Sequence, residues 1–226
     1  MKNFKTILLS VLGVMAMAVS FTSCNTESTN YSIDQQTQKQ YQATMANMYT
    51  GKMRAYYADV QKQQYVKYDS VQTRWTVRTD STLTISDFPV SILDSCINLN
   101  TPYAGSNNQE VQKLRSLKEA ISKLDTKIDL KCYYYVPATS FVTNSAISFF
   151  VNPMYFKQTL EYDGGKHDVY FVFLTNNYGG NYNYAARTFE FNMYLNSITF
   201  DKAPVDFNNQ VSKMFFRNIL FTCLSK

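Results

Sequence analysis

The stretch Val71-Gln-Thr-Arg-Trp-Thr-Val-Arg78, followed by the turn residues Asp80-Ser81 and by Thr82-Leu-Thr-Ile-Ser86, decides the fold class. Its apolar and polar residues alternate, which is typical of a strand with one buried and one solvated side. The buried side is predicted to hold Val71, Thr73, Trp75 and Val77. A link of so few residues excludes a parallel crossover, so the two strands are predicted to form part of an antiparallel meander.

The same two-residue period recurs before and after this hairpin. Further strands are predicted at 52–59, 128–136, 146–151, 156–162, 169–174 and 189–200, and a last one within 213–223. Asp163-Gly164-Gly165 is a hairpin turn signal, and a change of phase near Asn196-Ser197 indicates a bulge. The sequence therefore predicts an α+β protein dominated by antiparallel sheet, as an open barrel or a sandwich.

Two segments have the helical period instead. The first begins at Ser32, with Gln35 three residues on as in a capping box, and is predicted to end at Gly51. The second, Asn108–Leu124, carries an apolar stripe and a charged opposite side, so it is predicted to pack on the sheet. Its stripe is formed by Val111, Leu114, Leu117, Ile121 and Leu124.

The N-terminus has the features of a bacterial lipoprotein signal. Lys2 and Lys5 precede an apolar run that is shorter than the roughly 20 residues of a membrane-spanning helix. Phe21-Thr22-Ser23-Cys24 follows and resembles a lipobox, with Phe21 where Leu is usual. Residues 1–23 are therefore predicted to be a signal peptide and Cys24 the lipidated first residue, which anchors the chain to a membrane.

A short polar tether, 24–31, is predicted to connect this anchor to a single domain at 32–226. Position 25 is Asn; the absence of an Asp there favours the outer membrane of a Gram-negative bacterium. A weak sequence similarity between 83–90 and 198–205 leaves open the alternative that the domain consists of two related β modules, at about 50–100 and 127–224.

Composition excludes several classes of function. The formal net charge of +5 is dispersed without a Lys/Arg block, so a nucleic-acid partner is not expected. Cys96, Cys132 and Cys223 remain after Cys24; they allow one disulfide and one free thiol, or three buried thiols, and match no zinc spacing. No metal and no cofactor is expected.

Catalytic signatures are also missing from the sequence, and we expect no enzyme activity. The one histidine, His167, is predicted to lie in a solvated hairpin turn, where a Ser-His-Asp triad is not expected. A glycan-directed hydrolase with a carboxylate pair is kept as an alternative. The acids considered for it are Asp87, Asp94, Asp163 and Asp168, and no spacing singles out two of them.

Aromatic residues are the one positive signal, with 18 Tyr and 16 Phe in 226 residues. Tyr133 and Tyr135 fall on outward strand positions, and Tyr178, Tyr182 and Tyr184 fall in an Asn/Gly-rich segment, 176–184, read as a loop. Exposed rings stack on sugars or anchor protein partners. We therefore expect this loop to contact a ligand or partner; the alternative is that its rings cap one end of the sheet.

The lipobox, the polar tether, the N-terminal helix and the Tyr/Thr/Asn-rich strands together resemble small outer-envelope lipoproteins of Bacteroidetes. Several groups of these are known only as domains of unknown function, and some are calycin-like. Tyr49–Met53 and Thr82–Pro89 are similar to the start of their β domains. The resemblance carries no catalytic or binding residue across. We expect a lipid-anchored envelope protein with a non-enzymatic binding or structural role, and a glycan or an envelope protein as its partner. A carbohydrate-binding accessory protein is the first alternative.

Overall fold

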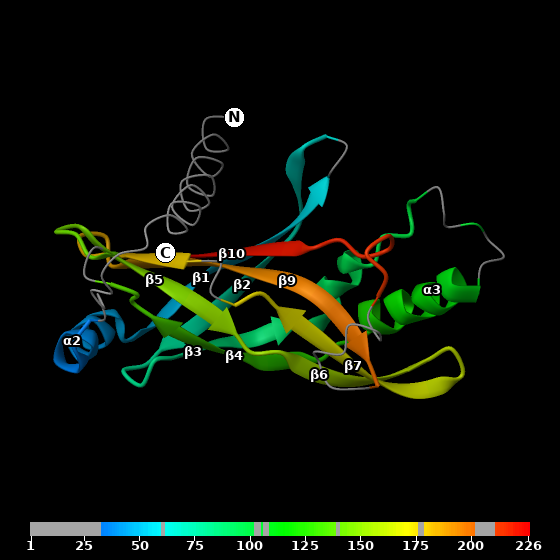
Figure 1. Cartoon of the computed structure of the whole chain (residues 1–226), viewed down its shortest axis with the longest axis horizontal. Helices are drawn as coiled ribbons and strands as arrows, with labels where there is room; N and C mark the ends of the chain where they lie inside the picture. Colours follow the sequence, from blue (N-terminus) through cyan, green and yellow to red (C-terminus); the bar gives the residue numbers. More distant parts are fainter. Residues whose placement is uncertain are drawn as a thin grey trace, which may run out of the picture.

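The computed structural model describes residues 33–59, 62–101, 105, 109–138, 141–175, 179–201 and 211–226. The predicted signal peptide 1–23, the lipidation site Cys24 and the tether 24–31 lie outside the described residues. The described chain forms one sheet with helical segments at its two ends (Figure 1).

The sheet has ten strands, and every pairing in it is antiparallel. Along the chain these are β1 (Asn47–Asp59), β2 (Gln64–Val77), β3 (Thr82–Pro89), β4 (Lys127–Tyr135), β5 (Ala146–Pro153), β6 (Phe156–Tyr162), β7 (Gly165–Phe173), β8 (Gly179–Asn183), β9 (Thr188–Phe200) and β10 (Ile219–Ser225). The predicted α+β class with mainly antiparallel sheet is confirmed.

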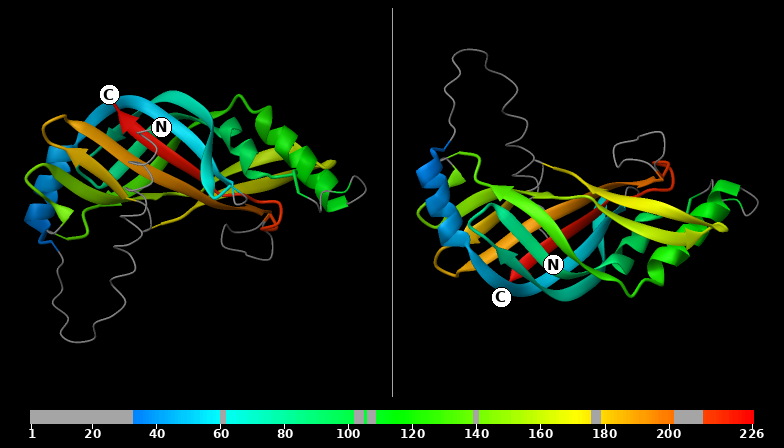
Figure 2. Two further views of the ribbon diagram at one scale, coloured as in Figure 1. Left: turned by 90° about the horizontal axis from the view of Figure 1, so that it is seen from above. Right: turned by 90° about the horizontal axis from the view of Figure 1, so that it is seen from below.

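The sheet closes into a barrel because β10 pairs with both β1 and β9. Eight strands form the ring, in the order β10-β1-β2-β3-β4-β5-β8-β9, and the β6–β7 hairpin extends from the far half of β9. The two segments considered as separate β modules, 50–100 and 127–224, therefore contribute strands to one and the same sheet. Of the two architectures left open by the sequence, the structure is the barrel (Figure 2).

The deciding hairpin has the predicted orientation. Trp75 and Val77 are buried and Val71 and Thr73 are half-buried, whereas Gln72 and Arg74 on the other side of the strand are exposed. The turn places Ser81 at a positive φ of 67°, and the Asp80 carboxylate accepts a hydrogen bond from the Thr82 backbone N–H at 3.0 Å. Short polar side chains stabilise such turns by bonding their own backbone.

The bulge expected near Asn196-Ser197 is also present. Val172 pairs with Ser197 and Phe173 with Leu195, so Asn196 is the extra residue on β9. The insertion reverses which alternate positions face inward, because side chains on a strand alternate between faces. Leu195 and Ile198 are accordingly both fully buried.

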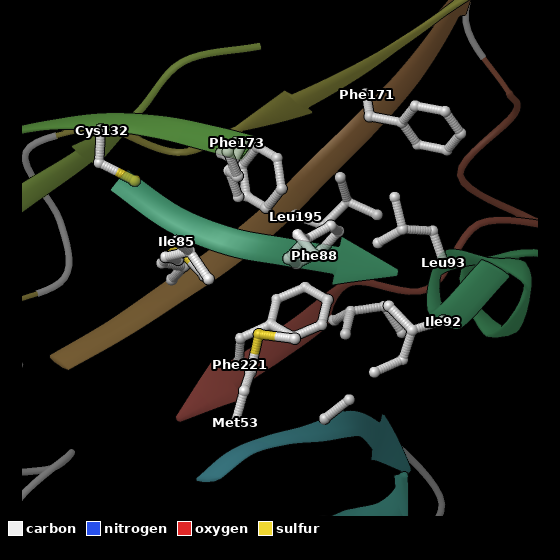
Figure 3. Close-up of a cluster of buried hydrophobic side chains, with 14 of the residues drawn as sticks. Met53, Ile85, Phe88, Ile92, Leu93, Cys132, Phe171, Phe173, Leu195 and Phe221 are labelled. Carbon is white, nitrogen blue, oxygen red and sulfur yellow. The ribbon is translucent and has the colours of Figure 1, made fainter. Parts of the chain in front are cut away.

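The interior of the barrel is filled by side chains, chiefly aromatic ones. Trp75 contacts Phe191 edge to face, with ring centroids 5.5 Å apart, and Phe149 stacks on Phe189 at 4.6 Å. Figure 3 shows the part of this core in which Phe88 and Phe221 meet, with a centroid distance of 5.5 Å. Barrels of eight strands have an interior just wide enough for side chains. The packed rings leave the outer wall and the two ends for binding.

Helical segments cover the two ends of the barrel. Figures 1 and 2 show α2 (Gln35–Met45) at one end and α3 (Gln109–Ser122) at the other. The 3-10 helix η1 (Val90–Cys96) brings Ile92 and Leu93 into the interior beside Phe88 (Figure 3). The amphipathic helix α3 packs against η1 and against β6.

The N-terminal helix is shorter than predicted at both ends. Its N-cap is Asp34, whose carboxylate accepts from the backbone N–H groups of Gln36 and Thr37 at 3.0 and 2.9 Å, so the Ser32–Gln35 capping box is wrong. The helix stops at Met45, and Gly51 lies inside β1. Pairing of β1 with two neighbouring strands outweighs the helical period of this segment.

The amphipathic helix is confirmed as α3. Val111, Leu114, Leu117 and Ile121 are buried, as the stripe predicts. Asn108, the predicted first residue, lies outside the described residues. The last predicted residue, Leu124, follows the helix and packs against the core.

The structure favours three buried thiols over a disulfide. Cys96, Cys132 and Cys223 are free, and each is at most 1% exposed. Burial raises the pKa of all three thiols far above the ordinary range, because desolvation disfavours the thiolate. They therefore act as small apolar core residues.

Buried tyrosines make the fold sensitive to alkaline pH. Burial raises the pKa values of Tyr49, Tyr68 and Tyr134 well above their ordinary range, and each hydroxyl donates to a backbone carbonyl oxygen at 2.6–2.7 Å. Unfolded tyrosine ionises near pH 10. We expect the free energy of unfolding to decrease as the pH rises above about 10, where only the unfolded chain loses these protons.

Urea melts at increasing pH, together with phenolate absorbance, would measure this effect. The phenolate absorbance of the folded protein should rise at a higher pH than that of the protein unfolded in urea. Full ionisation of the folded protein with an ordinary tyrosine pKa would contradict the prediction.

Candidate functional site

The predicted tyrosine loop is largely a strand. Residues 179–183 form β8, which pairs with β5 and β9, so the loop prediction is wrong there; Tyr178 lies outside the described residues. Tyr182 faces inward between Ile147 and Phe189 and is 8% exposed. Tyr184 is half-buried and meets the Tyr182 ring edge to face at 5.7 Å. These two rings fit the capping alternative better than a ligand contact.

An exposed aromatic surface lies on the outer wall of the barrel, across β3, β4 and β5; Tyr155, between β5 and β6, is a separate exposed ring. We call the surface across these three strands the Tyr133 face and define it by Thr82, Tyr133, Tyr135, Phe150 and Asn152. Tyr133 is 52% exposed, and it pairs in register with Thr82 on one side and Asn152 on the other. Directly paired residues of an antiparallel sheet share a face, so both polar side chains flank the Tyr133 ring.

A pair of rings continues the Tyr133 face along β4 and β5. Tyr135 pairs with Phe150, and their centroids lie 5.6 Å apart. Phe141 extends the row, 6.0 Å from Phe150. These three rings are half-buried, which fixes their orientation while leaving ring surface accessible. Alternation in the sequence correctly placed Tyr133 and Tyr135 outward, but Phe150 joins them only through the β4–β5 register, and Phe141 only through its ring contact with Phe150.

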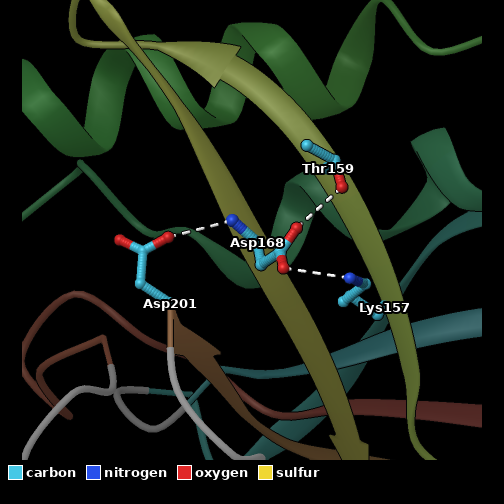
Figure 4. A network of polar contacts seen from close by, with 4 residues as sticks. All are labelled: Lys157, Thr159, Asp168 and Asp201. Atoms are coloured by element: carbon cyan, nitrogen blue, oxygen red, sulfur yellow. Dashed lines mark hydrogen bonds and ion pairs between the residues drawn. The ribbon is translucent and has the colours of Figure 1, made fainter.

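The best-defined polar cluster lies on the β6–β7 hairpin. The Asp168 carboxylate accepts hydrogen bonds from Lys157 Nζ at 2.9 Å and Thr159 Oγ1 at 2.7 Å (Figure 4). Its backbone N–H donates to Asp201 at 2.9 Å. The hydrogen bonds from Thr159 and Lys157 lower the pKa of Asp168, so it stays ionised and is not suited to act as a general acid.

His167 is held by the same part of the molecule. It lies on β7, not in a solvated turn as predicted, and its side chain is 20% exposed. Its Nδ1 is 2.9 Å from Asp201 Oδ2, and its ring lies 4.5 Å from the Tyr162 ring. The turn ends earlier, at Asp163 and Gly164, both with positive φ, and β7 begins at Gly165.

The four acids considered for a carboxylate pair lie on separate elements. Asp87 is at the irregular end of β3 near Arg74, and Asp94 is in η1. Asp163 is in the β6–β7 turn and Asp168 on β7. Only the last two share a hairpin, and Asp168 is already bound to Lys157 and Thr159.

Two features are absent from the described part of the chain, a metal-binding cluster and a membrane-spanning helix. No group of three or more His, Cys, Asp or Glu residues there is placed to hold a metal ion. No helix in that part has the length and apolar character needed to cross a membrane.

Comparison with known proteins gives one match. A family described as a domain of unknown function, DUF4840, matches residues 44–200, which run from the end of α2 to the end of β9. The matched segment contains the Tyr133 face and the β6–β7 hairpin. No curated protein and no solved structure matches the chain.

Proposed function

Because the chain belongs to the DUF4840 family, whose description gives no activity, we propose its function from the geometry: a non-enzymatic binding protein of the bacterial envelope. In this proposal Cys24 carries the lipid that anchors the chain to the outer membrane, and the barrel presents the Tyr133 face to its ligand. The observation that carries the proposal is the combination of a filled barrel interior with an aromatic outer wall.

A ligand inside the barrel is disfavoured by its packing. Calycin-type proteins of eight strands can hold one small ligand in the barrel, but here the large rings of Trp75, Phe149, Phe189 and Phe191 occupy that space. Binding through the outer wall needs no rearrangement of this core. The filled interior therefore supports a surface that binds an extended partner.

A glycan is the ligand class that the Tyr133 face fits best. A sugar ring presents an apolar face that stacks on an aromatic ring and hydroxyl groups that exchange hydrogen bonds at its edge. Tyr133 offers the exposed ring, and Asn152 places an amide beside it. On the other side the Thr82 hydroxyl donates to the Asp80 carboxylate, so it can accept a hydrogen bond from a sugar hydroxyl. The rings of Tyr135 and Phe150 could contact a second sugar of the same chain.

We expect Tyr133→Ala to remove glycan binding without unfolding the protein. The ring is half exposed, so its loss should change the free energy of unfolding by no more than about 1 kcal/mol. A glycan array followed by calorimetry with the best ligand would measure the loss of binding.

Tyr56→Ala is the matched control, because Tyr56 is an aromatic residue on β1, three strands away around the barrel from β4. It should leave binding unchanged. Equal loss in both variants, or an array without any signal for the wild-type protein, would contradict the glycan assignment.

The anchor makes a separate prediction. Cys24→Ala, or inhibition of the lipoprotein signal peptidase by globomycin, should leave an uncleaved or unanchored precursor, because the cysteine thiol is the acylation site. Electrophoretic mobility and detergent partitioning measure the change, and Cys96→Ala serves as a thiol control inside the fold. Unchanged partitioning after Cys24→Ala would rule out the anchor without affecting the glycan proposal.

A further inference from the structure

The β6–β7 hairpin ends the sheet in a strand with a free edge. In the described part of the chain β6 pairs with β7 and with no other strand. Figure 2 shows that the hairpin projects beyond the ring of eight strands. The free edge of a strand presents unpaired backbone N–H and C=O groups, which can pair with a strand of another chain.

The hydrogen bonds of Asp168 show which backbone groups of β6 point outward. The backbone N–H and C=O of Asp168 both bond to Asp201, at 2.9 and 2.8 Å, on the side of β7 away from β6. Thr159 is paired in register with Asp168, so the two residues exchange no backbone bonds and the backbone groups of Thr159 point away from β7. Because this pattern alternates along a strand, those of Lys157 and Glu161 point outward as well.

The side chains of the same three residues lie on one exposed face of β6. Lys157, Thr159 and Glu161 carry a positive charge, a hydroxyl and a negative charge in this order. Figure 4 shows the first two on the side of the hairpin that carries the Asp168 carboxylate. The helix α3 packs against β6, where the alternate residues Leu160 and Tyr162 are buried. The outward backbone groups therefore belong to the residues with exposed, charged or polar side chains.

This edge is complementary to itself in one antiparallel register. With Thr159 opposite Thr159 of a second copy, Lys157 lies opposite Glu161 of that copy at both ends of the pairing, and all seven residues of β6 are paired. Registers centred on Lys157 or Glu161 place like charges directly opposite each other, which destabilises a sheet. We propose that two copies of this chain associate through their β6 edges, in the register centred on Thr159, to form a continuous sheet β7-β6-β6-β7.

The charges on β7 fit the same arrangement. The Asp168 carboxylate lies 2.9 Å from Lys157 Nζ, and Lys166 Nζ lies 3.2 Å from the Glu161 carboxylate. In the dimer each Glu161 lies between Lys166 of its own chain and Lys157 of the second copy, so opposite charges alternate across the strands. Seven residues on each side make a small interface, so the dimer dissociates on dilution.

Oxidative cross-linking of the full chain in detergent tests the register. Thr159→Cys should form a disulfide-linked dimer, because opposed Cα atoms of a hydrogen-bonded pair lie about 5.5 Å apart, within disulfide range. Lys157→Cys alone should not, since its two sulfur atoms belong to positions roughly four residues, or about 14 Å, apart along the pairing. A mixture of Lys157→Cys and Glu161→Cys chains should again cross-link.

The native cysteines set the background of this experiment. Cys96, Cys132 and Cys223 are buried, and the unsubstituted chain is the control for Cys24. Equal cross-linking of Thr159→Cys and Lys157→Cys would show unspecific collisions, and it would overturn the proposal, as would a Thr159→Cys chain that does not cross-link.

Sedimentation equilibrium at increasing protein concentration tests the edge itself. Thr159→Pro should abolish the dimer and leave the monomer folded, because proline is tolerated on an edge strand where the missing N–H faces solvent. Thr159→Val is the matched control: it removes the same hydroxyl but keeps the N–H, and it should dimerise like the wild type. Circular dichroism checks that both variants are folded, and cross-linking decides alone if Thr159→Pro is not. A wild-type chain that stays monomeric, or a folded Thr159→Pro chain that dimerises like Thr159→Val, would overturn the proposal.

Discussion

Replacing Gly51 with alanine is expected to destabilise the barrel by about 3 kcal/mol, at the upper end of the usual cost of overpacking. A Cβ atom at this position would overlap the Leu224 carbonyl oxygen and lie 2.7 Å from both Ser225 Cα and Trp75 Cη2. Two of these three atoms are backbone of β10, which cannot move away without breaking its ladder with β1. That ladder is one of the two that attach β10 and close the barrel.

Urea melts would measure the change, with Gly105→Ala as the matched control. A Cβ atom at Gly105 meets nothing within 4 Å, so this substitution should stay within about 0.5 kcal/mol of wild type. Combining Gly51→Ala with Trp75→Phe separates the clash with the β10 backbone from the clash with the Trp75 ring. The coupling energy in this double-mutant cycle reports only the contact between the new Cβ atom and the indole ring. A Gly51→Ala protein as stable as wild type would show that β1 and β10 are not so closely apposed.

The local pattern predicted most of the elements because each strand buries one face. Alternation identified the buried side of β2 at Trp75 and Val77, and the change of phase identified the bulge at Asn196. These signals depend only on neighbouring residues and on burial. The same reasoning placed Tyr133 and Tyr135 on the outer wall.

The errors came from contacts between distant segments. Gly51 looked like a helix stop, yet it is the position where β1 must pass close to Trp75 and β10. The Asn/Gly-rich residues 179–183 looked like a loop, yet they pair with β5 and β9, and Tyr182 turns inward. His167 looked solvated because its partner, Asp201, is 34 residues away. Barrel closure and the Tyr133 face likewise depend on register, which no local pattern contains.

The second large effect is expected for Trp75→Ala, with a loss of about 3–5 kcal/mol. Trp75 is fully buried, lies between Tyr49 and Ile85 in the sheet, and meets Phe191 edge to face. Alanine would leave a large cavity at the centre of the barrel, where closed strands on all sides limit collapse. The indole Nε1 has no partner among the described residues, so its removal leaves no acceptor unpaired, and the lost packing is partly offset because a buried, unpaired donor is also removed.

Trp75→Phe provides the control for this interpretation. It keeps an aromatic ring against Phe191 and removes the buried, unpartnered N–H, so it should cost much less than Trp75→Ala. Urea melts of both variants measure the difference. A loss below about 1 kcal/mol for Trp75→Ala would mean that the indole is not enclosed, and the side of β2 that faces the core would have to be reversed. Since the filled interior is the reason for placing ligand binding on the outer wall, that outcome would also remove the main support for the Tyr133 face as the binding surface.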